Sequence, residues 1–240
     1  DVINHYYGRP STPLGAYTGR IGRPPLNHTK GVAPSWANEG RGTYVEDLLT
    51  HFPKRVNDYT EVPDALSIYI QTLEAAEDNS IVIVNIGLAT NVLDLLDDPH
   101  GLDLVRRKVA AYIVMGGRRL GGYEWNWSAD GWAGHDGVYS GLGAITKAAM
   151  DAWPATVPTY ILPFETGVDV PTGGVLSYAR SEMDEALDSP CRRGYYVYCG
   201  EGKSRSSWDP MAMLFAARGN TDQSYWIDAG TVTVWHDGEN

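Results

Sequence analysis

The sequence predicts an α/β fold with a doubly wound, mostly parallel sheet flanked by helices. Three observations carry this prediction: short apolar runs of strand length, amphipathic segments of helical period between them, and turn residues at the junctions. Strands that alternate with helices are typical of parallel sheets with right-handed crossovers. We expect a single domain over residues 1–240 that is incomplete at both ends, because the chain does not begin with Met and residues 236–240 resemble a turn before another strand.

The first regular elements are expected after a long irregular connection. Residues 8–43 are rich in Gly, Pro, Arg and Asn, which predicts little regular structure. A helix is predicted from residue 63 to about 79, because its apolar side chains recur every three or four positions. Residues 81–86 form a continuous run of mostly β-branched side chains, which is typical of a strand covered on both faces.

The later elements repeat the same alternation. They are helical pieces at 91–96 and 102–109 that break near Pro99 and Gly101, a buried strand at 111–115, a helix at 144–153, a strand at 159–162, and helices at 175–187 and 211–217. Asp94, Asp97 and Asp98 are interpreted as a solvated helix end and turn.

Composition excludes several classes of partner. Hydrophobic residues make up 43% and charged residues 20% of the chain, which is ordinary for a globular protein. A net charge of −11 repels phosphate backbones and anionic lipids. No apolar run reaches the ~20 residues that span a bilayer. We therefore expect a small-molecule partner, no nucleic-acid polymer and no membrane, in a monomer or a homo-oligomer.

The two cysteines, Cys191 and Cys199, bear on the compartment. They lie eight residues apart in a stretch rich in Gly, Arg and Tyr, a spacing that could close one small disulfide loop. We favour a disulfide in a secreted, extracellular protein over two thiols in a cytoplasmic one.

Polar residues follow the predicted strands. Residues 87–91 come after the first strand, 115–117 and 124–130 come after the second, and 207–210 precede the last helix. The carboxyl ends of strands in a doubly wound sheet meet in one crevice, where ligands bind. We expect these segments to converge there.

Each of these residues also has an ordinary structural interpretation. Thr90 or Asn91 could cap a helix, Glu124 and Asn126 could be solvated, and Asp209 could be an N-cap with Pro210 at the first helical position. Together, their oxygen atoms suit a calcium ion and a polyhydroxy substrate better than a phosphate.

Four segments in this order resemble a known family. Residues 81–91 (IVIVNIGLATN), 114–117 (VMGG), 124–130 (EWNWSAD) and 208–212 (WDPMA) are similar to the inosine/uridine-preferring nucleoside hydrolases, as are residues 3–15. The resemblance implies a calcium-dependent nucleoside N-ribohydrolase, a glycosidase that serves purine or pyrimidine salvage. It also implies the site: Thr90 (through its backbone carbonyl) and Asp209 as calcium ligands, Glu124 and Asn126 on the ribose hydroxyls, Met115 lining the sugar site, and Trp208 at the base.

The sequence departs from the family pattern in three places. It contains no DxDxxxDD motif, so the general-base Asp is expected upstream of residue 1. Trp208 stands where many members place a His that protonates the leaving base; tryptophan cannot deliver that proton, although it can stack on a purine. Residues 118–123 lack the asparagine often found before the glutamate.

These departures leave three functional hypotheses. The first is a hydrolase that cleaves the N-glycosidic bond of ribonucleosides with a calcium-held water. The second is a catalytically silent, secreted member of the fold that binds a nucleoside or sugar or serves in an assembly. The third is another glycosyl hydrolase that uses Glu124 and Asp130 as an acid/base pair.

Overall fold

The computed structural model describes residues 1–17, 44–119, 124, 126–127, 142–177 and 189–219. Contacts within the chain divide it into two compact units: unit 1 is Asp1–Ile68 with Val170–Ser206, and unit 2 is Tyr69–Asp169 with Ser207–Asn240. Each unit is described by itself below. The prediction of one domain stays a prediction.

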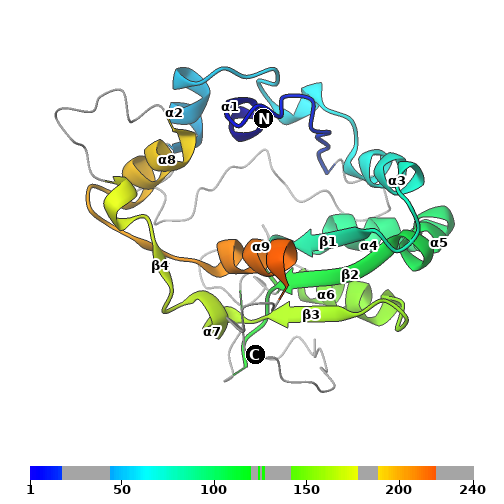
Figure 1. Ribbon diagram of the computed structural model, residues 1–240. Helices are drawn as coiled ribbons and strands as arrows, with labels where there is room; N and C mark the ends of the chain where they lie inside the picture. Colours follow the sequence, from blue (N-terminus) through cyan, green and yellow to red (C-terminus); the bar gives the residue numbers. More distant parts are fainter. Residues whose placement is uncertain (18–43, 120–123, 125, 128–141, 178–188, 220–240) are drawn as a thin grey trace. The chain divides into compact units, whose positions relative to one another are not determined.

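Unit 2 contains a three-stranded parallel sheet. Its strands are β1 (Ile81–Asn85), β2 (Val109–Met115) and β3 (Thr159–Leu162), in the order β1-β2-β3, and their arrows point the same way in Figure 1. The four residues at the carboxyl end of β2 are each at most 3% exposed. Burial on both faces explains the apolar run in the sequence. The predicted α/β fold with a parallel sheet flanked by helices is confirmed.

Helices pack on this sheet and on one another. The helices of this region are α4 (Thr90–Asp97), α5 (Pro99–Lys108), α6 (Leu142–Ala152), α7 (Phe164–Gly167) and α9 (Trp208–Arg218). Phe215 of α9 joins one buried cluster with Ile113 and Met115 of β2. Leu93 of α4 packs against Ala149 of α6 in a second cluster. The sheet and its helices therefore share an apolar core built from segments that are distant in the sequence.

A buried polar pair joins β1 to β2. The Asn85 Nδ2 atom donates a hydrogen bond to the Tyr112 hydroxyl over 3.1 Å, and both side chains are at most 9% exposed. The Tyr112 ring stacks on Trp153 with 4.1 Å between centroids. Burial raises the pKa of Tyr112 to about 12 although the Asn85 bond acts in the opposite direction. The phenol is therefore held protonated inside the unit.

The interruption expected near Pro99 and Gly101 separates α4 from α5. Asp98 has an extended backbone, and its side chain accepts a hydrogen bond from the Gly101 amide over 2.8 Å, with Pro99 at the start of α5. A Cβ at residue 101 would lie 2.4 Å from the Leu95 carbonyl oxygen. The prediction that Asp94 is solvated is wrong, since it is 6% exposed and lies on the buried part of α4.

Three predicted elements differ in detail from the structure. The first predicted helix is α3 (Ala65–Ala75), which begins two residues later and ends about four residues earlier than expected. Val82 in β1 is 40% exposed, so the expectation of cover on both faces is wrong there; β1 lies at the edge of the described sheet, where fewer neighbours cover it. Of the helix expected at 175–187, residues Gly174–Ser177 form a 3₁₀ turn, and 178–188 lie outside the described residues.

Unit 1 consists of short elements. They are α1 (Val2–Tyr6), α2 (Tyr44–His51), the 3₁₀ turns Tyr59–Glu61 and Gly174–Ser177, the paired strands β4 (Pro171–Thr172) and β5 (Arg205–Ser206), and α8 (Pro190–Cys199). The predicted disulfide is wrong, because Cys191 and Cys199 are thiols within the single helix α8. Eight helical steps of 1.5 Å place them ~12 Å apart, beyond the ~7 Å limit between bridged Cα atoms. The prediction of a secreted protein rested on this disulfide and is now without support.

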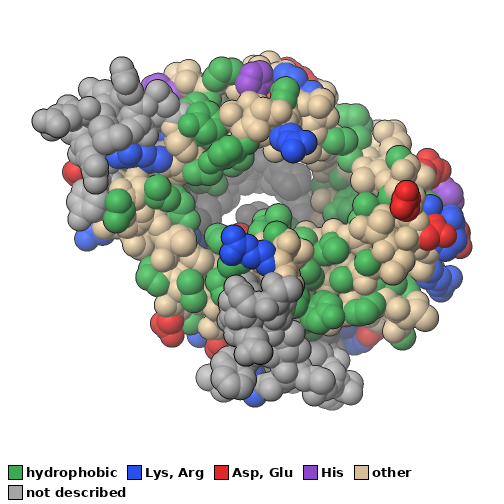
Figure 2. Space-filling model, in the orientation of Figure 1, with side chains coloured by type: hydrophobic (Ala, Val, Ile, Leu, Met, Phe, Trp, Pro, Cys, Tyr) green, Lys and Arg blue, Asp and Glu red, His purple; other side chains and the backbone are tan. Residues whose placement is uncertain are grey.

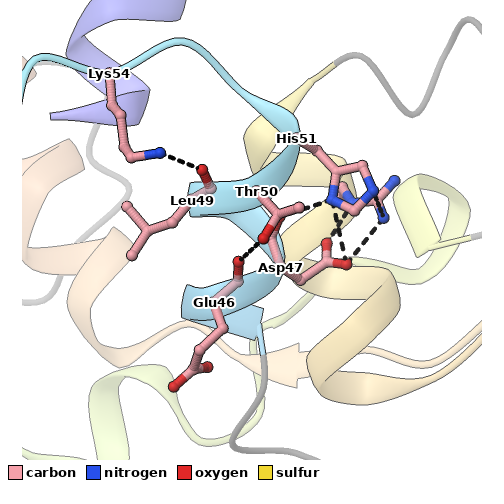
Figure 3. A network of polar contacts seen from close by, with 7 residues as sticks. Glu46, Asp47, Leu49, Thr50, His51 and Lys54 are labelled. Carbon is pink, nitrogen blue, oxygen red and sulfur yellow. Dashed lines mark hydrogen bonds and ion pairs between the residues drawn. The ribbon is translucent and has the colours of Figure 1, made fainter. Parts of the chain in front are cut away.

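An ion pair connects α2 to α8. The Arg193 guanidinium donates to both carboxylate oxygens of Asp47, and its Nη2 lies 3.0 Å from His51 Nε2. Side chains of α2 also form hydrogen bonds with the backbone of the same helix. The Thr50 Oγ1 atom, for example, donates to the Glu46 carbonyl over 2.8 Å (Figure 3). The hydrogen bond from Arg193 lowers the pKa of Asp47, and the Asp47 carboxylate raises the pKa of Arg193.

We expect Arg193→Met to lower the free energy of unfolding of unit 1 by about 2 kcal/mol, because the partly buried Asp47 carboxylate then loses both hydrogen bonds from the guanidinium. The side chains are 20% and 22% exposed. Since the pKa of folded Asp47 is lowered, the pair stabilises above about pH 4 and its contribution fades as the pH falls further. Urea unfolding followed by circular dichroism measures the change.

The matched control is Arg107→Met, which breaks the pair with Asp103 where the side chains are 46% and 56% exposed. Its expected cost is about 0.5 kcal/mol or less. Equal costs for the two variants would contradict a stabilising role for the Arg193 pair.

The described surface mixes polar and apolar groups. Figure 2 shows hydrophobic side chains reaching the surface among other types, and the exposed large ones in unit 2 include Tyr160, Met213 and Leu214. Among the described residues, none of the helices has the length and apolar character needed to cross a membrane.

Candidate functional site

Asn126 connects the carboxyl ends of two neighbouring strands. Its Nδ2 atom lies 3.3 Å from the carbonyl oxygen of Ile86, which directly follows β1. The same atom lies 3.2 Å from the sulfur of Met115, the last residue of β2. The amide therefore sits at the sheet edge where ligands bind in parallel α/β folds.

Glu124 lies beside Asn126 in a tight turn. Its Oε2 atom accepts a hydrogen bond from the Asn126 backbone amide over 2.8 Å, and its carbonyl accepts one from the Trp127 amide over 3.0 Å. Thr146 of α6 donates from its hydroxyl to the Trp127 carbonyl over 2.8 Å. The turn is thus tied to α6, and the Glu124 carboxylate is held against the Asn126 backbone.

Trp127 covers the two glycines, Gly116 and Gly117, that directly follow β2. A Cβ at Gly116 would lie 1.8 Å from the Trp127 Nε1 atom, so only glycine fits beneath the indole. Gly117 has φ of 78°, a conformation that also favours glycine. The sequence analysis did not single out Trp127. The Gly116-Gly117 pair indicates that another group approaches the backbone closely, but it does not identify that group.

Trp208 lies at the start of α9 and contacts the segment after β3. Its Nε1 atom donates to the Phe164 carbonyl over 2.9 Å, and the two rings have centroids 5.3 Å apart. The N-cap of α9 is Ser207, which is 1% exposed, and the helix begins at Trp208. The interpretation of Asp209 as an N-cap with Pro210 at the first helical position is therefore wrong, and Asp209 lies in the first turn instead.

The start of α4 contributes one further polar atom. Thr90 is the first residue of α4 and is 4% exposed, and the N-cap, Ala89, has no side chain that could cap the helix. Among the described residues, no hydrogen-bond partner reaches the buried Oδ1 atom of Asn91. Leaving such an acceptor unmet costs about 1–3 kcal/mol, so a ligand that donates to it would recover that energy.

The structure brings some of the predicted residues together and separates others. Hydrogen bonds join Asn126 to both Met115 and Glu124, and Trp208 packs on the apolar cluster that contains Met115. Thr90 and Asp209 lie at the starts of two different helices, α4 and α9. Asp130 lies outside the described residues.

Calcium takes 6–8 oxygen ligands in proteins. The candidates in the described part of the chain are the Thr90 carbonyl, the Asn91 Oδ1 atom and the Asp209 carboxylate. No group of three or more His, Cys, Asp or Glu side chains that could hold a metal occurs among the described residues. These residues do not by themselves fit a complete calcium site.

Comparison of the chain with protein-family models, with curated proteins and with solved structures found no match. The resemblance to nucleoside hydrolases therefore stays a prediction.

Proposed function

We propose that the carboxyl ends of β1 and β2 bind the ribose of a nucleoside, and that the chain is part of a hydrolase that cleaves the N-glycosidic bond of ribonucleosides. One observation carries the proposal: the Asn126 amide spans the two strand ends with the Glu124 carboxylate held next to it. The order of the motifs along the sequence supports the same function.

The hydrogen-bond arrangement suits a vicinal diol. Both hydrogens of the Asn126 amide are directed to Ile86 and Met115, and among the described residues no donor reaches its Oδ1 atom. Glu124 adds a carboxylate acceptor from the same turn. Two adjacent hydroxyl groups of a sugar supply two donors, and two adjacent acceptors match them.

Cleavage of an N-glycosidic bond passes through an oxocarbenium-like sugar, so the enzyme must brace the ring, activate water and stabilise the departing base. Glu124 and Asn126 would perform the first task by holding the hydroxyls. The 240 residues contain no DxDxxxDD motif to supply the base that activates water. The resemblance implies a calcium ion with Thr90 and Asp209 among its ligands, but the described residues do not by themselves supply the 6–8 oxygen ligands of such a site.

A silent binding protein is the second candidate. It is favoured by Trp208, whose indole N–H already donates to the Phe164 carbonyl and which has no acidic proton to deliver at neutral pH. Both candidates require the sugar site, and they differ in turnover.

Calorimetric titration with inosine and 2′-deoxyinosine tests the shared site. We expect the ribonucleoside to bind about 10-fold to 100-fold more tightly, because a hydrogen bond to a charged group contributes about 1.5–3 kcal/mol. Equal affinities would overturn the proposal.

Assays of inosine and uridine hydrolysis, with and without a chelator, then separate the two candidates. Turnover supports the hydrolase, and ribose-dependent binding without turnover supports the silent protein.

A further inference from the structure

In unit 2, the segments that follow β2 and β3 hold a cation against an aromatic pair. The guanidinium carbon of Arg118 lies 4.2 Å from the centroid of the Phe164 ring. The Phe164 ring also packs against Trp208. A guanidinium over an aromatic face is attracted by the ring electrons.

The backbone holds this arrangement at the ends of β2 and β3. The Phe164 amide donates to the Gly117 carbonyl over 2.9 Å, and the Gly116 amide donates to the Leu162 carbonyl over 3.1 Å. The Phe164 carbonyl in turn accepts from Trp208. Phe164 is thus fixed through both its N–H and its C=O, and Arg118 leaves the sheet three residues after Met115.

Arg118 is exposed and keeps its charge available. Among the described residues no carboxylate forms an ion pair with it, although the chain as a whole carries a net charge of −11. The contact with the ring uses none of the guanidinium N–H groups in a hydrogen bond, so they remain able to donate. A guanidinium can donate two parallel hydrogen bonds to a planar group with acceptors and negative charge.

We propose that Arg118 recognises the nucleobase and stabilises it as a leaving anion; this inference rests on the proposed function. When the oxygen of water bonds to the anomeric carbon and the C–N bond breaks, the electron pair of that bond passes to the base nitrogen. The base then departs as an anion, and the proton released by water reaches solvent. Trp208 cannot protonate the base, whereas the guanidinium donates hydrogen bonds to its developing charge.

Binding of free bases tests this without requiring turnover. Urate is an anion at pH 7.5 and hypoxanthine is neutral, so their affinity ratio reports recognition of charge on the base. We expect the full chain to bind urate at least 10-fold more tightly, and Arg118→Met to reduce this ratio to about one. Arg119→Met removes the same charge one residue away and should keep the preference, while Arg118→Lys should keep only part of it.

The affinity for ribose distinguishes a failure of the role proposed for Arg118 from a failure of the proposed function. Ribose binding that survives in Arg118→Met, together with the loss of the urate preference, supports the inference. A urate preference that persists in Arg118→Met, or nucleoside binding without any urate preference in the unaltered chain, overturns the role of Arg118 alone. Failure of the unaltered chain to bind ribose, nucleosides and bases overturns the proposed function and this inference together.

Discussion

Tyr112→Ala is expected to lower the free energy of unfolding of unit 2 by about 3–5 kcal/mol, the range for removing a large buried aromatic side chain. Tyr112 is 2% exposed on the central strand and stacks on Trp153. Its loss leaves a cavity, and it also leaves the buried Asn85 amide without its hydroxyl partner. Urea unfolding followed by circular dichroism measures the change.

Two controls separate burial from the hydroxyl group. Tyr160→Ala removes the same side chain from β3, where it is 36% exposed, and should cost about 1 kcal/mol. Tyr112→Phe keeps the ring and removes only the hydroxyl. In the folded protein that phenol has a pKa of about 12, against about 10 when unfolded. The contribution of the protonated phenol to the free energy of unfolding is therefore complete below pH 10. It is lost as the pH rises through 12, by about 3 kcal/mol in total.

Tyr112→Phe should lack this loss of stability at high pH. Identical pH dependence of Tyr112→Phe and the unaltered chain would contradict a buried, protonated phenol. A cost for Tyr112→Ala no greater than that for Tyr160→Ala would contradict the central place of Tyr112 in the core.

Asn126→Ala is expected to weaken nucleoside binding about 30-fold to 100-fold, while the free energy of unfolding falls by no more than about 1 kcal/mol. The substitution removes the acceptor proposed for a sugar hydroxyl and also the amide that contacts Ile86 and Met115. Calorimetric titration with inosine measures the affinity.

Asn126→Asp is the sharper variant, because it retains an acceptor but loses both donors. It places a negative charge against the Ile86 carbonyl, so it should also lose most of the affinity. Met115→Leu removes only the sulfur acceptor at nearly constant volume and should change the affinity less than about 5-fold. If Asn126→Asp binds inosine as well as the unaltered chain does, the two contacts to Ile86 and Met115 do not position the site.

The sheet of unit 2 could be predicted because its strands are buried and continuous. β3 (Thr159–Leu162) has the predicted bounds, and β2 (Val109–Met115) begins only two residues earlier than expected. Helix α8 (Pro190–Cys199) was missed, because its stretch is rich in Gly, Arg and Tyr and the spacing of its cysteines suggested a small disulfide loop. Its place is set by contacts with distant residues, such as Asp47, which a local pattern does not contain.

Part of the candidate site could be predicted, because polar residues that follow parallel strands lie at the same end of the sheet. Glu124 and Asn126 follow a predicted strand, and the resemblance to nucleoside hydrolases implied their roles on the ribose. The structure joins Asn126 to both Glu124 and Met115. The stack of Arg118 on Phe164 could not be predicted, because the two residues are brought together only by pairing of β2 with β3. The contact of Trp127 with Gly116 could not be predicted either, because a glycine indicates a close contact without identifying the contacting residue.

The absence of space beneath the Trp127 indole sets an evolutionary constraint. A larger residue at position 116 requires a smaller residue than tryptophan at position 127. The replacement of Trp127 would therefore have to precede that of Gly116 for the single variant to fold. Homologues should therefore show covariation between these two positions, with glycine at the first wherever tryptophan occupies the second.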